Sequence, residues 1–297
     1  MNKQELAHYI KAGKISQEIR AYIIKIVKPE MKLVSLVTQI HAKIEELGGK
    51  AAFPVNLSID DVAAHFHPAT NDERVAQGLL KVDFGIAVQG CIADSAVSID
   101  LTKDKKYGPL IAAAQAALEN ALDLLEKNPS LHDIGKVIQE TIEKKGFSPI
   151  INLSGHSMAP YKIHAGITIP NYGNGNRATL PAGVYAIEPF ATTGEGKIYS
   201  GEGGNIYELE NIKQVRSPFA RKVLQYILDE YKTLPFSLRV IEEKFGSMAR
   251  LALRELEKNG VIQHHAMLIE KTHHPVSQAE HTFIKTSDGK IIVTTRD

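Results

Sequence analysis

Apolar residues recur at helical spacing over much of the chain, and this recurrence predicts where its helices lie. In the N-terminal stretch apolar side chains return every three or four positions until Gly48-Gly49 provide a stop. The same spacing appears again in the middle of the chain and after Ser217, where the stretches begin with polar residues. The expected helices cover 3–12, 15–27, 32–47, 107–127, 131–145, 218–231, 237–245 and 247–259.

Short apolar runs broken by Gly, Asn and Asp lie between these stretches and predict strands and loops. A strand pair is expected over 261–271, and residues 279–295 alternate around Ser287-Asp288-Gly289 as a hairpin does. Glycine-rich loops are expected from Gly155 to 204. Three helices followed by a strand pair is the order of a winged helix, but many small helical modules share that order.

Composition narrows the class of protein. Hydrophobic residues make up 43% and charged residues 23%, which is typical of a globular chain, and a net charge of +1 argues against a general polyanion-binding surface. No signal peptide or membrane span is visible, so we expect a cytoplasmic protein with no membrane partner. The single cysteine, Cys91, cannot form an internal disulfide and is expected to be a buried packing residue.

The most informative segment, 79–99, is typical of a hairpin, with its turn expected near Val88-Gln89. In a symmetric hairpin that turns there, Asp83 lies directly opposite Asp94. Cross-strand partners have Cβ atoms about 4.5–5.5 Å apart, and two like charges so placed are destabilising. A divalent cation or a shared proton would relieve the repulsion. A slipped register would instead leave both acids in solvent, and the hairpin alone leaves these alternatives open.

Further candidate metal ligands stand in other segments. His156 follows Gly155 in an expected loop, Glu188 ends the apolar run 184–187, and Glu280 enters an expected strand. A single histidine or glutamate of this kind is more commonly a core or edge residue. Together with the paired aspartates, however, they favour a metal site.

Taken in order, five separated motifs resemble the type II methionine aminopeptidases, which belong to the pita-bread metallohydrolases. The motifs are Ala52-Phe53-Pro54 with Ala63-Ala64-His65, the Asp83/Asp94 hairpin, Gly155-His156 with Tyr161-Lys162-Ile163-His164-Ala165-Gly166, Ala186-Ile187-Glu188, and Gln278-Ala279-Glu280-His281-Thr282. The resemblance covers essentially the whole chain and is closest to the compact archaeal form. It implies an α+β pita-bread fold in which a winged-helix-like helical subdomain, 211–271, is inserted into a catalytic domain formed by 1–210 and 272–297.

The resemblance also implies a reaction. The protein would remove the initiator methionine from nascent polypeptides, with two divalent metal ions activating a water molecule for attack on the first peptide bond. The ions would be Co, Mn or Fe, and Zn is also compatible. Asp94 and Glu280 would bridge the two ions, Asp83 would chelate one of them, and His156 with Glu188 would complete the other.

Four further roles follow from the same resemblance. Glu188 would shuttle a proton, His164 would donate to the developing oxyanion, and His65 would bind the scissile amide nitrogen. Phe53, His65, Ile163 and His164 would bind the substrate, with an apolar slot suited to the unbranched thioether of methionine. The pairs His264-His265 and His273-His274 are expected at the surface or in the insertion rather than on a metal. Eukaryotic relatives carry tyrosine at position 265, so the rim of the pocket is expected to differ here.

Related functions share parts of this pattern. Xaa-Pro aminopeptidases and prolidases use the same ligands but usually carry an extra N-terminal domain, and only 82 residues precede Asp83 here. A non-catalytic binding relative of the same fold would lack the ligands. A winged-helix transcription factor would leave the acids without a purpose, so a nucleic-acid partner is not expected. We expect a monomer, and a contact with the ribosome is left open.

Overall fold

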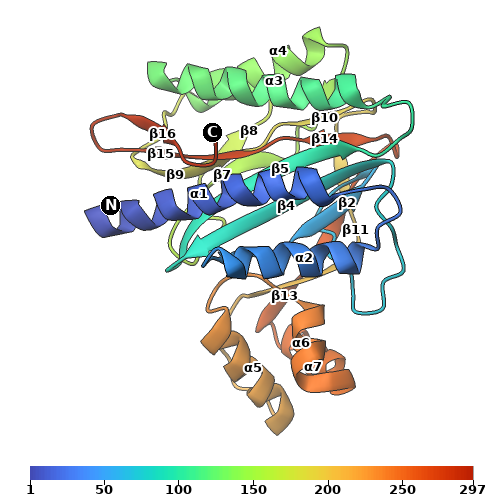
Figure 1. Cartoon of the computed structure of the whole chain (residues 1–297). Helices are drawn as coiled ribbons and strands as arrows, with labels where there is room; N and C mark the ends of the chain where they lie inside the picture. The colour runs from blue at the N-terminus through green and yellow to red at the C-terminus, as the bar shows by residue number, and fades with distance from the viewer. Residues whose placement is uncertain (297) are drawn as a thin grey trace.

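The computed structural model describes residues 1–296, in which helices cover antiparallel sheets (Figure 1). The α-helices are α1 (Lys3–Ile26), α2 (Leu33–Glu46), α3 (Gly108–Leu124), α4 (Leu131–Lys144), α5 (Pro218–Glu230), α6 (Leu238–Phe245) and α7 (Ala249–Lys258), and the short 3-10 helices are η1 (Leu125–Lys127) and η2 (Gly246–Met248). The strands are β1 (Lys50–Ala51), β2 (Asn56–Ile59), β3 (Val62–Ala64), β4 (Leu79–Val88), β5 (Cys91–Asp100), β6 (Ser148–Pro149), β7 (Ser154–Met158), β8 (Thr168–Pro170), β9 (Gly183–Ile187), β10 (Phe190–Thr192), β11 (Ile198–Leu209), β12 (Phe236–Ser237), β13 (Ile262–Glu270), β14 (Val276–Gln278), β15 (His281–Lys285) and β16 (Ile291–Val293).

The N-terminal helices α1 and α2 pack on the sheet that contains β4 and β5, and their apolar faces form one hydrophobic cluster with it. A capping box of Asn2 and Glu5 starts α1. The prediction of two helices, 3–12 and 15–27, is wrong because α1 runs through Gly13 without a break. A Cβ at Gly13 would lie 2.3 Å from the carbonyl oxygen of Thr294, so this glycine allows a close contact rather than ending a helix.

The long hairpin β4–β5 is the centre of the fold, and its register differs from the expected one. Val88 pairs with Cys91 across a two-residue turn, Gln89-Gly90, whose φ angles of 50° and 84° suit a type I′ turn. The prediction that Asp83 lies directly opposite Asp94 is therefore wrong. The register differs by two residues, however, which keeps both side chains on one face as diagonal neighbours.

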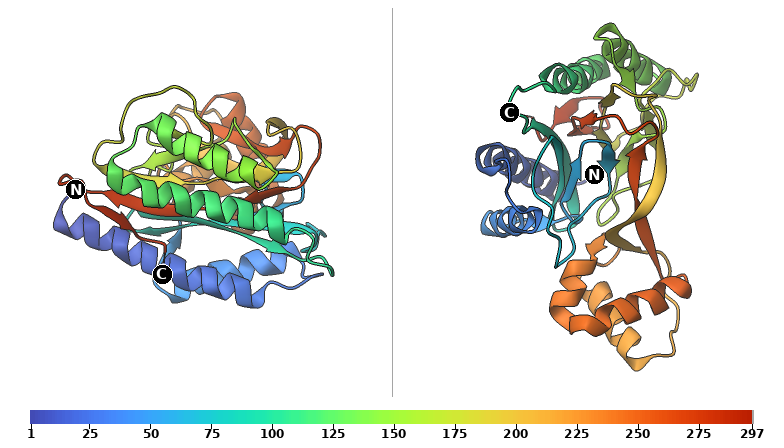
Figure 2. Two further views of the ribbon diagram at one scale, coloured as in Figure 1. Left: turned by 90° about the horizontal axis from the view of Figure 1, so that it is seen from above. Right: turned by 90° about the vertical axis from the view of Figure 1, so that its right-hand side faces the viewer.

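Helices α3 and α4 pack on the sheet with the order β16-β15-β9-β7-β8. Figure 2 shows this helix pair and the α1–α2 pair against different parts of the strands. Ser130 and Asp133 form a capping box at the start of α4. The predicted loop around His156 is wrong, since this residue lies in β7, the strand beside β9.

Helices α5, α6 and α7 pack at one end of the molecule around a hydrophobic cluster of their own (Figure 1). All three helices were expected, and Ser217 and Ser237 cap α5 and α6. The expected strand pair over 261–271 is wrong, because these residues contain the single strand β13, which pairs with β11 and β3. The expected loop before residue 204 is also partly wrong, since β11 begins at Ile198.

Two further local expectations, the C-terminal hairpin and the burial of Cys91, are confirmed. Strands β15 and β16 form the C-terminal hairpin, and Cys91 is a buried free thiol. None of the helices within residues 1–296 combines the length and the apolar character needed to cross a bilayer.

Candidate active site and metal centre

The hairpin presents two aspartates to the interior of the fold, Asp94 buried and Asp83 partly buried. Asp83 extends from β4 and Asp94 from β5, toward the segment that joins β14 to β15. Thr282 of β15 holds the backbone of Asp94: its Oγ1 accepts a bond of 2.7 Å from the Asp94 amide and donates one of 2.9 Å to the Asp94 carbonyl. This reciprocal contact fixes the end of β5 that carries Asp94.

Glu280 is brought to the hairpin by two contacts with β5. Ser98 donates to the carbonyl of Gln278 at 2.7 Å and accepts from its amide at 2.8 Å, and Ala96 forms an isolated β-bridge with Glu280. These contacts join segments about 180 residues apart in the chain. Glu280 therefore lies beside Asp94, although nothing local in the sequence links them.

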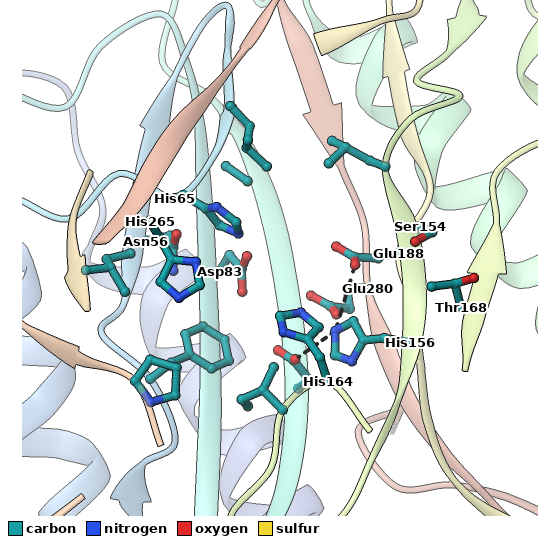
Figure 3. Close-up of a pocket in the computed structure, with 18 of the residues that line it drawn as sticks. Asn56, His65, Asp83, Ser154, His156, His164, Thr168, Glu188, His265 and Glu280 are labelled. Carbon is teal, nitrogen blue, oxygen red and sulfur yellow. Dashed lines mark ion pairs between the residues drawn. The ribbon is translucent and has the colours of Figure 1, made fainter. Parts of the chain in front are cut away.

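His156 and Glu188 approach the same point from neighbouring strands. His156 pairs with Ala186 of β9, and Glu188 follows the end of that strand. The Nε2 atom of His156 lies 3.7 Å from an Asp94 carboxylate oxygen and 3.8 Å from one of Glu188 (Figure 3). The buried amide of Asn171 donates to the Glu188 carbonyl at 3.2 Å and so supports the turn that presents this glutamate.

The acids and the imidazole have the composition and spacing of a metal site. One ligand atom each from Asp94, His156 and Glu280 lie within 4.8 Å of one another. Oxygens of Asp83, Asp94 and Glu280 are buried without a hydrogen-bond partner. Buried carboxylate oxygens are costly unless paired or coordinated to metal, so these residues fit the divalent cations that the resemblance implies.

The acid–base properties of the cluster support the same conclusion. Burial raises the pKa of Asp83 to about 7, against a smaller lowering by the Gln278 amide. Burial, followed by the charge of neighbouring carboxylates, raises the pKa values of Asp94, Glu188 and Glu280 well above their usual range. Without cations the cluster therefore keeps protons at pH values where exposed carboxyl groups have lost them, and bound cations would displace those protons.

Gln278 is a site residue for which the sequence suggested no role. Its Nε2 lies 3.3 Å from an oxygen of Asp83 and 3.4 Å from one of Glu188, so the amide bridges two candidate ligands. The only sequence signal for this position is its place two residues before Glu280 in the fifth motif. Such hydrogen bonds orient metal ligands, and they are not visible in sequence spacing.

The cluster opens into a cavity of about 410 Å³ that includes every predicted site residue. Phe53 and Ile163 supply part of an apolar wall, while His65 and His164 stand near the acids (Figure 3). His65 has a φ of 64°, an uncommon conformation for a residue with a side chain and one often found at functional sites. Burial, with smaller contributions from other histidines, lowers the pKa of His65 to about 3.

His265 was expected at the surface or in the insertion, and it lies in β13, within residues 211–271. It lines the cavity, where its ring packs against that of His65 with centroids 5.5 Å apart. Its neighbour His264 is half-buried and stacks on Tyr207, while His273 and His274 are exposed as expected. The sequence signal for His265 was its correspondence to a tyrosine in eukaryotic relatives.

Comparison with known proteins decides the family. The model of metallopeptidase family M24 matches residues 7–217 of the chain. The methionine aminopeptidase of Pyrococcus horikoshii is 41% identical over 290 residues, which cover 96% of this chain and 98% of that protein. The chain belongs to metallopeptidase family M24. The methionine aminopeptidase of Methanocaldococcus jannaschii is also similar, with 39% identity over 288 residues and coverage of 96% and 97%. The resemblance of this M24 chain to the type II methionine aminopeptidases is thereby confirmed.

Solved structures show that the M24 chain has the expected mixed α+β pita-bread fold. A thermophilic Arx1 superposes with a TM-score of 0.84 at 17% identity, covering 99% of this chain and 91% of that one. The methionine aminopeptidase of Thermotoga maritima superposes with a TM-score of 0.70 at 20% identity, covering 100% and 98%. At these identities the likeness concerns the fold alone.

Proposed function

We propose that this chain removes the N-terminal methionine from polypeptides by metal-assisted hydrolysis of the first peptide bond. The observation that carries this proposal is the convergence of four buried or partly buried carboxylates and one imidazole, from separate segments, on one cavity. The near-complete similarity to methionine aminopeptidases favours methionine as the first residue. A non-catalytic relative would have no use for buried, unpaired carboxylate oxygens.

The proposed ligand set divides between two divalent ions. Asp94 and Glu280 would bridge them, Asp83 would hold one ion, and His156 with Glu188 would complete the other. Bound ions would polarise the scissile carbonyl and lower the pKa of a water molecule at the site. Four carboxylates and one imidazole suit Mn, Fe or Co, and also accept Zn.

The protein's own side chains would then bind and transfer protons around the scissile bond. Burial, the largest cause, lowers the pKa values of His65 and His164, so both imidazoles are neutral at pH 7 and each carries one N–H donor. We assign His164 to the developing oxyanion and His65 to the scissile amide. Glu188 would accept a proton from the attacking water at a carboxylate oxygen and deliver it to the leaving amine.

The apolar end of the cavity would bind the methionine side chain. Phe53 and Ile163 belong to one hydrophobic cluster with Leu234, and Pro235 follows it into the cavity wall. An unbranched thioether is flexible and apolar, so it fits a slot of this kind. The nearby acids would receive the substrate's free ammonium group, which would limit cleavage to the first bond.

The domain division remains a proposal. We propose that 211–271 is a winged-helix-like insertion into a catalytic domain of 1–210 and 272–297. The separate hydrophobic cluster around α5, α6 and α7 supports an insertion. The pairing of β13 with β3 nevertheless joins the end of the insertion to the catalytic sheet. A monomeric protein that acts on nascent chains in the cytoplasm is consistent with this proposal.

Hydrolysis of a short peptide tests the proposed function directly. We expect Met-Ala-Ser to release methionine in the presence of Mn or Co, and a chelator to abolish the reaction because it removes the ions from the carboxylate cluster. Xaa-Pro peptides provide the comparison, measured by chromatography of the products. Cleavage of Xaa-Pro peptides with no release of methionine from Met-Ala-Ser would replace this function by that of a prolidase.

Removal of the His164 imidazole tests the oxyanion assignment. We expect His164→Ala to lower kcat on Met-Ala-Ser by about 10²–10³, the usual effect of losing one oxyanion donor, with little change in KM. His164→Gln is the matched variant, since its amide retains an N–H donor and should recover part of the loss. A variant that changes KM alone would assign His164 to substrate binding instead.

A further inference from the structure

The ribbon formed by β11 and β13 turns one polar pair into the cavity. His265 pairs with Ile206 across the ribbon, and Glu208 lies two residues further along β11, so all three side chains share a face. All three line the cavity. The alternate residues, Tyr207 and His264, stack on each other with ring centroids 4.2 Å apart, on the side of the helical cluster.

A bulge in β11 sets this orientation. The register between β11 and β13 shifts between Gly203 and Ile206, where Asn205 adopts a φ of 62°. Gly204 packs on the catalytic side of the fold: a Cβ there would lie 1.6 Å from the carbonyl oxygen of His65. β-Bulges of this kind redirect side chains near active sites. The ribbon is therefore held directly against the segment that carries His65.

Glu208 and His265 form a close pair with one carboxylate oxygen left available. Oε2 of Glu208 lies 3.2 Å from Nε2 of His265, and the two side chains are 22% and 17% exposed. Oε1 has no hydrogen-bond partner among residues 1–296. Since the side chain is reachable from the cavity, this oxygen is an acceptor available to a ligand.

The pair adjoins the apolar end of the cavity. Strand β11 pairs with β12 through Ile206 and Tyr207. Strand β12 directly follows Leu234 and Pro235, which belong to the apolar wall of the cavity. Figure 3 shows His265 beside His65, across the cavity from His156 and Glu280. A first-residue side chain in the apolar slot would therefore reach Glu208.

We propose that Glu208, held by His265, allows this chain to accept first residues whose unbranched side chains end in an N–H donor, such as lysine or glutamine, in addition to methionine. The inference rests on the proposed function, because the reaction is the same addition of water across the first peptide bond. An apolar side chain that covers Glu208 displaces the water that hydrogen-bonds to its free oxygen and offers no donor in exchange, which weakens binding. An amine or amide of similar length replaces that bond, and an ammonium group also matches the charge.

Four peptides that differ only in the first residue test this proposal: Met-Ala-Ser, norleucine-Ala-Ser, Gln-Ala-Ser and Lys-Ala-Ser. Norleucine is the apolar reference because it is unbranched and lacks a donor. We expect the metal-loaded wild-type protein to cleave all four. Glu208→Met should lower kcat/KM for the lysine and glutamine peptides, relative to norleucine, at least about tenfold, which corresponds to about 1.4 kcal/mol.

Two further variants separate charge from shape. Glu208→Gln keeps the length and an acceptor oxygen, so it should reduce the preference for lysine while retaining cleavage of the glutamine peptide. Glu202→Gln changes an exposed acid of the same strand. It should leave kcat/KM for the lysine and glutamine peptides unchanged relative to that for the norleucine peptide. Failure to cleave Lys-Ala-Ser and Gln-Ala-Ser, or ratios that do not change in either folded Glu208 variant, would overturn the inference. Failure to cleave Met-Ala-Ser as well would instead contradict the proposed function.

Discussion

Replacement of Asp94 by asparagine is expected to lower kcat/KM for Met-Ala-Ser by about 10³ or more, since several kcal/mol of metal-ion catalysis depend on a carboxylate proposed to contact both ions. The variant should bind less than one ion per chain, measured by elemental analysis after dialysis. It should remain folded, because Thr282 holds the backbone of residue 94 through contacts that do not involve its side chain.

The matched control is Asp104→Asn, which removes an exposed acid just beyond the same hairpin. This variant should keep the wild-type metal content and activity. Unchanged activity and metal content in Asp94→Asn would show that the proposed bridging ligand is not a ligand at all. Loss of folding, detected by circular dichroism, would be a separate result and would show that Asp94 stabilises the fold.

The metal-free protein is expected to lose stability as the pH rises from 6.5 to 8.5. Burial raises the pKa values of Asp94, Glu188 and Glu280 well above their usual range, so the folded state retains protons that the unfolded chain releases near pH 4. A folded state that binds more protons is destabilised by rising pH, at about 1.4 kcal/mol per pH unit for each extra proton. Burial lowers the pKa of the Lys81 ammonium to about 7, which offsets one such proton above that pH. Each further retained proton would lower Tm by roughly 4–6 °C over this range.

The pH range is chosen to avoid the histidines. Burial, as the largest cause, lowers the pKa values of His65, His156 and His281 to about 3. These histidines make the folded state more stable as the pH rises, but only below the pKa of a histidine in the unfolded chain, near 6.5. Thermal unfolding should be recorded with chelator and again with Mn. Bound Mn should remove most of the slope because the ions replace the protons, and a Tm that is constant or rises with pH in the chelated protein would contradict the prediction.

Features set by short stretches of sequence were predicted well. Helices α2, α4, α5 and α6 begin and end within a residue or two of the expected positions, because apolar spacing and capping residues such as Ser130 and Ser217 act within a few turns of a helix. The break expected near Gly13 was wrong for a reason that is not local, namely the contact with Thr294 near the other end of the chain.

Features that depend on pairing were predicted less well. The hairpin register depends on which two residues form the turn, Val88-Gln89 or Gln89-Gly90. That choice also decides which residues lie opposite Asp83 and Asp94. Strand β11 was expected to be largely loop, because its glycines interrupt the alternation of inward and outward side chains that indicates a strand. That alternation is visible only toward its end, at Ile206 and Glu208. Without β11, the resemblance alone related position 265 to the rim of the pocket, and the sequence could not indicate the contact between His265 and Glu208.

The sequence by itself determined the chemical types available to this protein: the motifs that carry its carboxylates and histidines, and the order of most of its helices. Only the tertiary structure decided that Glu280 lies beside Asp94, that Gln278 bridges Asp83 and Glu188, and that a polar pair adjoins the apolar slot. The physical reason is that residue types and helical spacing are local properties. Contacts between segments as much as about 180 residues apart arise only when strand pairing and core packing fix every element at once.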